Sequence, residues 1–210
     1  MSPWSRLERL ALADLFERLG PDAPTLCTGW TTRDLAAHLV ARDRRIDAAG
    51  AILVPPLGSH AGRVQRGYAG KPFSELVALV RGGPPVWSVV RLPPIDAAVN
   101  TIEFFVHHED VRRAQEGWQP RALGPDLQDA VWRQLRASSR LVMRRAPAGV
   151  VLRRPDGGEI VAKSGTPRVT VSGLPSEIVL FAYGRQDHAM VELVGDTELV
   201  DQMRTAKFGI

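Results

Sequence analysis

The chain has 210 residues, 44% hydrophobic and 24% charged, which is the composition of a folded globular protein and excludes extensive disorder. A chain of this length forms an adequate core as one large domain or two small ones, without disulfide bonds. The formal net charge is +4, but basic and acidic residues alternate along the chain and aromatic residues make up only 6%, so no nucleic-acid-binding groove is expected.

Helices are expected through the first two thirds of the chain. Ser2 and Pro3 form a cap and first turn, and Gly20-Pro21 ends the helix that follows. Thr31 and Asp34 have the spacing of a capping box, with Asp in place of Glu. The apolar spacing then predicts helices over residues 3–19, 31–50, 72–81, 95–116 and 126–145.

Residues 51–71 contain two prolines, four glycines and no clear apolar period, which predicts a long loop. Loops of this length inside a domain usually carry function or move.

The pattern changes at Pro147, after which short strand-like runs are expected at 150–153, 159–162, 169–171 and 190–194. A buried helix is expected over 175–183, and Asp196 is expected to cap a last helix. The sequence therefore predicts an α+β protein with an N-terminal helical bundle over 1–146 and a small α+β domain over 147–210.

A single cysteine, Cys27, excludes an intramolecular disulfide framework and fits a reducing compartment. Charged residues interrupt the apolar residues near the N-terminus, and no apolar run is long enough to span a bilayer. We expect a cytoplasmic protein without a membrane partner, monomeric or homodimeric. Three of the 27 basic side chains are Lys and the rest are Arg, which suggests a high-GC bacterial source.

His38 lies on the same helical face as Leu35 and Leu39, so its imidazole is expected among apolar side chains, where it needs a partner. A hydrogen bond to a backbone carbonyl or to Asp34 would satisfy it as an ordinary core histidine. A metal ion would satisfy it equally well.

Glu103 and His107 are four residues apart and project side by side from one helix. They form either a surface Glu-His pair or part of a metal site. Together with His38 they supply two imidazoles and one carboxylate, and three protein ligands with a vacant fourth position are typical of catalytic zinc sites. Helical bundles often build such sites from inward-facing side chains.

The stretch from Cys27 to Leu39 resembles the Gly-Trp-x-x-x-Asp-Leu-x-x-His-Leu signature of the mycothiol-dependent maleylpyruvate isomerase family, a group of DinB-like four-helix bundles. The Glu103 to His107 spacing is similar to the second signature of that family, and residues 169–173 and 181–185 resemble its small sterol-carrier-like C-terminal domain. The glycine-rich 51–71 segment has no match in the isomerase proper, and the run from Phe104 to Asp110 resembles a separate, actinobacterial branch of the family.

The resemblance implies a divalent metal ion, usually Zn²⁺, held by His38, Glu103 and His107, with mycothiol as the thiol co-substrate. A thiol at the vacant position would bind as thiolate, the nucleophilic form. In an isomerase the thiolate would add to a conjugated double bond, allow rotation and leave, whereas in an S-transferase it would stay on the product.

Other polar residues have weaker claims. Asp110 is expected either to orient His107 or to pair with Arg113 or Arg33, and His108 points away from His107. Arg185 is the candidate catalytic residue that would hold a substrate carboxylate, with a helix-end role as the alternative. Cys27 is expected to be a spectator, and His60 and His188 receive no role.

The leading hypothesis is therefore a metal-dependent, thiol-using isomerase or S-transferase acting on a small organic molecule. The alternatives are a non-catalytic metal-binding or small-ligand-binding protein, and a structural partner protein whose three polar side chains lie far apart.

Overall fold

The first two helices begin where the capping signals predict. In α1 (Pro3–Leu19), the hydroxyl of Ser2 accepts a hydrogen bond from the backbone N–H of Ser5, and Gly20, with φ of 80°, ends the helix. In α2 (Thr32–Arg44), the Asp34 carboxylate accepts from the backbone N–H of Thr31 at 3.0 Å and from its hydroxyl at 2.9 Å. The Asp34 side chain thus makes its half of the predicted capping box, in which it accepts from the backbone N–H of Thr31.

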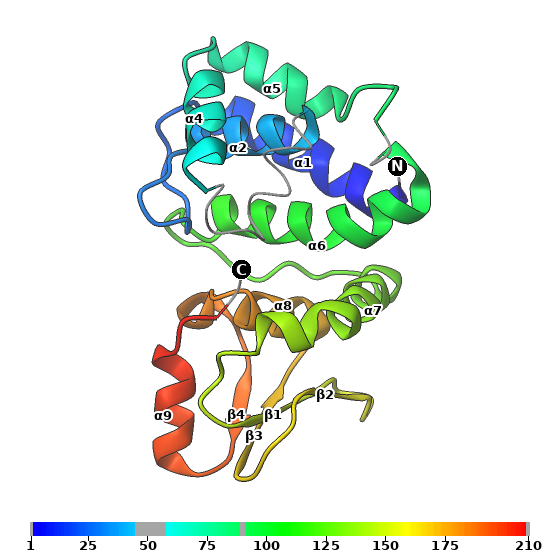
Figure 1. The fold of residues 1–210 in the computed structure, drawn as a ribbon, viewed down its shortest axis with the longest axis vertical. Helices are drawn as coiled ribbons and strands as arrows, with labels where there is room; N and C mark the ends of the chain where they lie inside the picture. Colours follow the sequence, from blue (N-terminus) through cyan, green and yellow to red (C-terminus); the bar gives the residue numbers. More distant parts are fainter. Residues whose placement is uncertain (1, 45–57, 89–90, 209–210) are drawn as a thin grey trace. The chain divides into compact units, whose positions relative to one another are not determined.

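The computed structural model describes residues 2–44, 58–88 and 91–208, and the chain divides into two units, Met1–Gln119 and Pro120–Ile210 (Figure 1). The first unit contains α1, α2, α4 (Gly58–Ala69), α5 (Phe73–Gly82) and α6 (Pro93–Arg112). Helix α1 packs against α5 and α6, and α2 packs against α4 and α5. The unit is a helical bundle.

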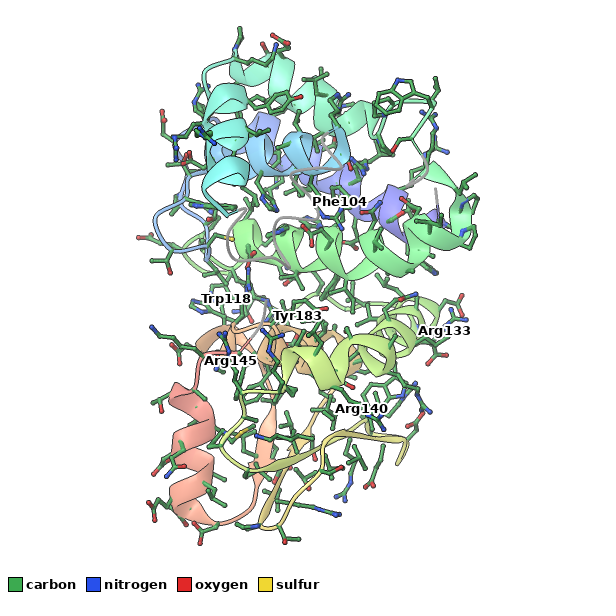
Figure 2. The ribbon with its side chains drawn as sticks, viewed as in Figure 1. Phe104, Trp118, Arg133, Arg140, Arg145 and Tyr183 are labelled. Atoms are coloured by element: carbon green, nitrogen blue, oxygen red, sulfur yellow. The ribbon has the colours of Figure 1, made fainter. Side chains whose placement is uncertain are left out.

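The bundle core is apolar and consists of residues from five helical faces and the turns beside them. Its fully buried members include Phe16, Leu35, Leu39, Leu76 and Phe104. Phe104, labelled in Figure 2, lies on the side of α6 that faces the other helices of this unit. This packing fixes how α6 is rotated about its axis, and hence where its polar residues point.

The long loop predicted over 51–71 is wrong for its second half, because residues 58–69 form α4. Glycines at 58, 62 and 67 lower the intrinsic helix propensity, but contacts of α4 with α2 outweigh that local preference. The first half of the predicted loop, and the end of the helix predicted to reach residue 50, lie outside the described residues.

The second unit contains a four-stranded sheet with strand order β2-β1-β3-β4, formed by β1 (Gly149–Arg153), β2 (Glu159–Lys163), β3 (Arg168–Ser172) and β4 (Glu192–Val194). β1 pairs antiparallel with β2 and parallel with β3, and β3 pairs antiparallel with β4. A Cβ atom on Gly149 would collide with the carbonyl oxygen of Gly165, so glycine is required where β1 begins.

Helices complete the second unit: α7 (Pro125–Val142), the wholly buried α8 (Pro175–Ala182), a short 3₁₀ helix (Gln186–His188) and α9 (Thr197–Thr205). Helix α7 packs against α8 and β2, and Gln128 of α7 exchanges hydrogen bonds with Ser176 of α8 at 3.0 and 2.9 Å. The boundary between the units thus follows Gln119. The sequence-based boundary lies after residue 146 and would assign α7 to the bundle. The apolar face of α7 therefore packs on α8 and β2 within the second unit.

The α+β fold class, with a helical bundle preceding a small mixed unit, is confirmed. Among the helices of the described residues, none has the length and apolar character required to cross a bilayer.

Candidate metal centre

His38 lies at the edge of the buried face of α2. Its neighbours Ala37 and Leu39 are fully buried, while the His38 side chain keeps 17% of its surface exposed. The indole of Trp30 packs against the imidazole with ring centroids 5.1 Å apart. Trp30 itself packs on the bundle core, so the turn before α2 fixes the orientation of the His38 ring.

Glu103 and His107 occupy successive turns of α6, as their spacing predicts. The structure brings His38 to the same place, because Nε2 of His38 lies 3.4 Å from Oε1 of Glu103 and Nε2 of His107 lies 3.3 Å from that same oxygen. The two imidazole rings are 5.4 Å apart between centroids. One candidate ligand atom from each of the three residues lies within 4.8 Å of the other two.

These separations are long for hydrogen bonds and close to those between two ligands of one metal ion. An N–H···O hydrogen bond has a typical length of about 2.9–3.0 Å. Ligand atoms about 2.0–2.1 Å from a tetrahedral zinc ion lie roughly 3.3–3.4 Å from one another. The two nitrogens stand at this second distance from the Glu103 oxygen, so the donor set fits a divalent ion with two imidazole ligands and one carboxylate ligand.

The carboxylate is held in its charged form. Burial by itself would raise the pKa of Glu103, but the positive charge of Arg42 and hydrogen bonds from His107 and His38 outweigh it, so that the pKa lies well below its ordinary value. Nε of Arg42 lies 3.3 Å from Oε1 of Glu103. Glu103 is therefore an anion at neutral pH.

The far side of the His107 ring contacts Asp110. Nδ1 of His107 is 2.9 Å from Oδ2 of Asp110, whose side chain is fully buried. In the neutral form of His107, a carboxylate at Nδ1 holds the remaining proton on that nitrogen, and the lone pair is then on Nε2, which faces Glu103. Arg113, one partner considered for Asp110, forms an ion pair with Glu109 at 2.6 Å.

The thiol of Cys27 belongs to the same cluster. It donates to Oδ2 of Asp110 at 3.2 Å, and its sulfur lies 3.9 Å from Nδ1 of His107. Burial would lower the pKa of His107, but hydrogen bonds with Asp110, Cys27 and Glu103 outweigh it and raise that pKa well above its ordinary value. The sequence predicts Cys27 to be a spectator, whereas in the structure its thiol contacts Asp110 and the ring of His107, on the side away from Glu103.

Two contacts at this centre were missed from the sequence, Cys27 and Arg42. Arg42 follows His38 by four residues, so the helical spacing already placed them on one face. Cys27 gave no comparable signal, because it precedes α2 and reaches Asp110 only through the fold.

The remaining candidates lie elsewhere. His108 pairs with Glu8 of α1, with Nδ1 of the ring 2.7 Å from the carboxylate, and both side chains are buried. His188 lies in the second unit, and the side chain of His60 lies outside the described residues. His108 therefore links two helices, as its direction on α6 suggests.

Arg185 also belongs to the second unit, immediately before the 3₁₀ helix. Its guanidinium donates to the carbonyl of Tyr183, which follows α8 and is labelled in Figure 2. This contact is the helix-end interaction considered for it, and a role toward substrate stays a prediction.

Two solved structures have the same fold as this chain: the mycothiol-dependent maleylpyruvate isomerase and a histidine-to-alanine mutant of it. Each superposes with a TM-score of 0.64 over 92% of this chain and 92% of its own, at 18% and 19% sequence identity respectively. At this identity the likeness establishes the fold alone. No protein-family model and no curated protein matches the sequence.

Proposed function

We propose that this protein is a divalent-metal-dependent enzyme that uses a low-molecular-weight thiol, either as an isomerase or as an S-transferase. The observation that carries the proposal is the approach of Nε2 of His38 and Nε2 of His107 to one carboxylate oxygen of Glu103 at ligand-to-ligand distances. The proposed ion is Zn²⁺, because two imidazoles and one carboxylate form a donor set found in catalytic zinc sites.

Two features favour a catalytic site over a structural one. The set offers three protein ligands, whereas structural zinc sites close with four. The side chains of His38, Glu103 and His107 keep 17%, 24% and 12% of their surfaces exposed, so a small molecule reaches them from solvent. A bound divalent ion would supply the positive charge that lowers the pKa of a thiol at the fourth position.

The residues around the ligands would prepare them for this role. Asp110 holds the Nδ1 proton of His107, so Nε2 is the nitrogen that would bind the ion on losing its own proton, and Arg42 keeps Glu103 ionised. A thiolate beside them would form an S–C bond to a conjugated double bond of the substrate. Addition makes the former double bond single, so that rotation about this C–C bond followed by cleavage of the S–C bond re-forms the double bond, returns the thiolate and gives an isomer. Retention of the S–C bond with proton uptake at the neighbouring carbon gives an S-conjugate.

The thiol that we propose is mycothiol, since the protein whose fold this chain shares is named as mycothiol-dependent. The same name supports a small organic acid as substrate. We further propose that Arg185 binds the substrate carboxylate, in which case Arg185→Ala raises KM for an acidic substrate and leaves metal content unchanged.

Metal analysis of the purified protein tests the first part of the proposal. We expect close to one equivalent of divalent metal per chain, lost in His38→Ala and in His107→Ala. His188→Ala, in the second unit, is the matched control and should retain the metal. A wild-type protein that is free of metal and fails to take up Zn²⁺ would refute a metal-dependent function.

Thiol binding tests the second part. Mycothiol should raise the melting temperature of the metal-loaded protein, because a ligand that binds only the native state stabilises it. It should have no effect after chelation. A loaded protein that binds metal but gains no stability from mycothiol, and consumes no thiol with any electrophile, would instead be a non-catalytic metal-binding protein.

A further inference from the structure

Helix α6 carries four polar side chains in one row: Asp96, Asn100, Glu103 and His107, separated by four, three and four residues. The last two are proposed metal ligands. The first two are fully buried, at 0% exposure, and have no role in the proposed function. Buried polar groups cost free energy unless every one is satisfied, so their contacts need an explanation.

Asn100 connects two charged neighbours. Its Nδ2 donates to Oδ1 of Asp96 at 2.8 Å, and its Oδ1 accepts from Nη1 of Arg42. A carboxylate only accepts hydrogen bonds and a guanidinium only donates them. The amide of Asn100 therefore has one orientation that satisfies both partners.

Arg42 connects Asn100 to the proposed metal ligand Glu103. Nη2 donates to the carbonyl oxygen of Val99 at 2.7 Å, and Nη1 is held by Asn100. Because the guanidinium is planar, fixing both Nη atoms also fixes the direction of Nε. Nε points at Oε1 of Glu103, 3.3 Å away, the same oxygen that both imidazoles approach.

The other end of the row is attached to α1. Oδ2 of Asp96 accepts from the backbone N–H of Ser2 at 2.6 Å and from the hydroxyl of Ser5. Asp96 thus has partners for both carboxylate oxygens. The contacts form a continuous chain from the start of α1, through Asp96, Asn100 and Arg42, to Glu103, which we name the Asn100 relay.

We propose that Asn100 and Asp96 are positioning residues of the metal centre, which act through Arg42 to hold the Glu103 carboxylate where its Oε1 atom faces both imidazoles. This inference rests on the proposed metal-binding function. A glutamate side chain has three rotatable bonds, and a carboxylate without the relay would sample rotamers that direct it away from His38 and His107. The relay therefore makes the third ligand available in advance.

A role in folding alone makes a different prediction from a role in positioning. The relay joins α1, α2 and α6, so a purely structural relay would affect the free energy of unfolding and leave the bound metal unchanged. Substitution at Asn100 separates the two roles, because Asn100→Ala changes no charge and removes no residue that touches the ion.

The experiment measures Zn²⁺ affinity by competition with a chelator, and the visible d–d spectrum after loading with Co²⁺, for wild type and Asn100→Ala. Loss of an outer contact to a metal ligand costs about 10–100-fold in metal affinity, and we expect a loss in this range with an altered Co²⁺ spectrum. Thr101→Val is the matched control, because Thr101 is the next residue of α6, is 2% exposed, and is isosteric with valine. It should keep the wild-type affinity and spectrum.

A lowered melting temperature in Asn100→Ala, with wild-type Zn²⁺ affinity and Co²⁺ spectrum, would show the relay to be structural and overturn the inference. If Asn100→Ala fails to fold, the isosteric Asp96→Asn replaces it, with a smaller affinity loss expected and an unchanged affinity counting against the relay. Wild-type protein that binds neither ion would refute the proposed function and the relay together, whereas failure of the relay alone leaves wild-type binding intact.

Discussion

Glu103 is the residue on which the contacts of the centre converge. One of its oxygens is approached by His38, His107 and Arg42, each from 3.3 or 3.4 Å. In this arrangement a bound metal ion would take the place of the protons that the two imidazoles direct at the carboxylate oxygen. The chemistry of the site therefore depends on which groups hold protons.

The pH dependence of metal binding follows from the raised pKa of His107. Below that pKa the imidazole carries a proton that an incoming ion must displace, so binding releases about one proton from His107 and affinity rises about tenfold per pH unit. Above it the affinity levels off. Titration calorimetry in buffers of different ionisation enthalpy measures the released protons, and a proton count near zero at acidic pH would contradict the expectation.

Whereas metal affinity rises with pH, the free energy of unfolding of the metal-free protein should fall as the solution becomes alkaline. The raised pKa of His107 gives stability that is complete below its ordinary value of 6.5 and is lost as the pH rises through the folded pKa. The lowered pKa of Glu103 gives stability that is present above its ordinary value of 4.5 and is lost as the pH falls through the folded pKa. Urea unfolding of protein freed of metal by a chelator measures the free energy of unfolding. Both side chains should contribute fully to it only between about pH 4.5 and 6.5.

Asp110 offers a test of the hydrogen bond behind His107. Asp110→Asn preserves shape but removes the charge at Nδ1, so the pKa of His107 should fall. At a pH above the His107 pKa of both proteins, where no proton competes with the ion, loss of this contact to the ligand should lower Zn²⁺ affinity about 10–100-fold. NMR titration of the His107 ring and chelator competition measure the two effects. An unchanged imidazole pKa would mean that the Asp110 contact does not govern His107.

At the scale of elements, a buried ion pair joins α1 to α2 within the bundle. Arg9 and Asp43 form a bidentate pair with side chains 0% and 1% exposed, and the guanidinium also donates to the Val80 carbonyl and stacks on Phe104, 3.9 Å from the ring centroid. Asp43 directly follows Arg42 in the sequence. It sets the position of α2 on which His38 is carried.

Removing one partner of this pair should be costly. Arg9→Met leaves Asp43 buried without its charge partner, and we expect a loss of about 3–5 kcal/mol in the free energy of unfolding. Changing both residues, as Arg9→Met with Asp43→Leu, removes the unpaired charge and should recover much of that loss. Urea unfolding measures both variants, and equal losses in the two would argue against an unpaired charge as the cause.

At the scale of the molecule, the proposed ligands all belong to the first unit, Met1–Gln119. Metal binding should therefore stabilise the amides of α2 and α6 against hydrogen exchange, by about 2.7 kcal/mol when free metal is 100-fold above Kd. Exchange in the strands of the second unit should be unchanged. Protection that spreads equally over β1–β4 would show that the two units respond together.

The sequence by itself determined the features that depend on local periodicity. The helical repeat places Glu103 beside His107, the Thr31 to Asp34 spacing caps α2, and the change of pattern after Pro147 marks the strands. These are interactions between residues a few positions apart, and backbone geometry alone fixes them.

The tertiary structure decided what depends on packing between distant segments. An amphipathic helix such as α7 fits any apolar surface, so its sequence did not reveal that it packs on α8 and β2. Likewise, only the packing of α2 near α6 brings His38 within 3.4 Å of Glu103 and Arg42 into line with Asn100. The site was predictable as three residue types on helical faces, whereas their meeting at one oxygen, and the thiol of Cys27 behind it, required the fold.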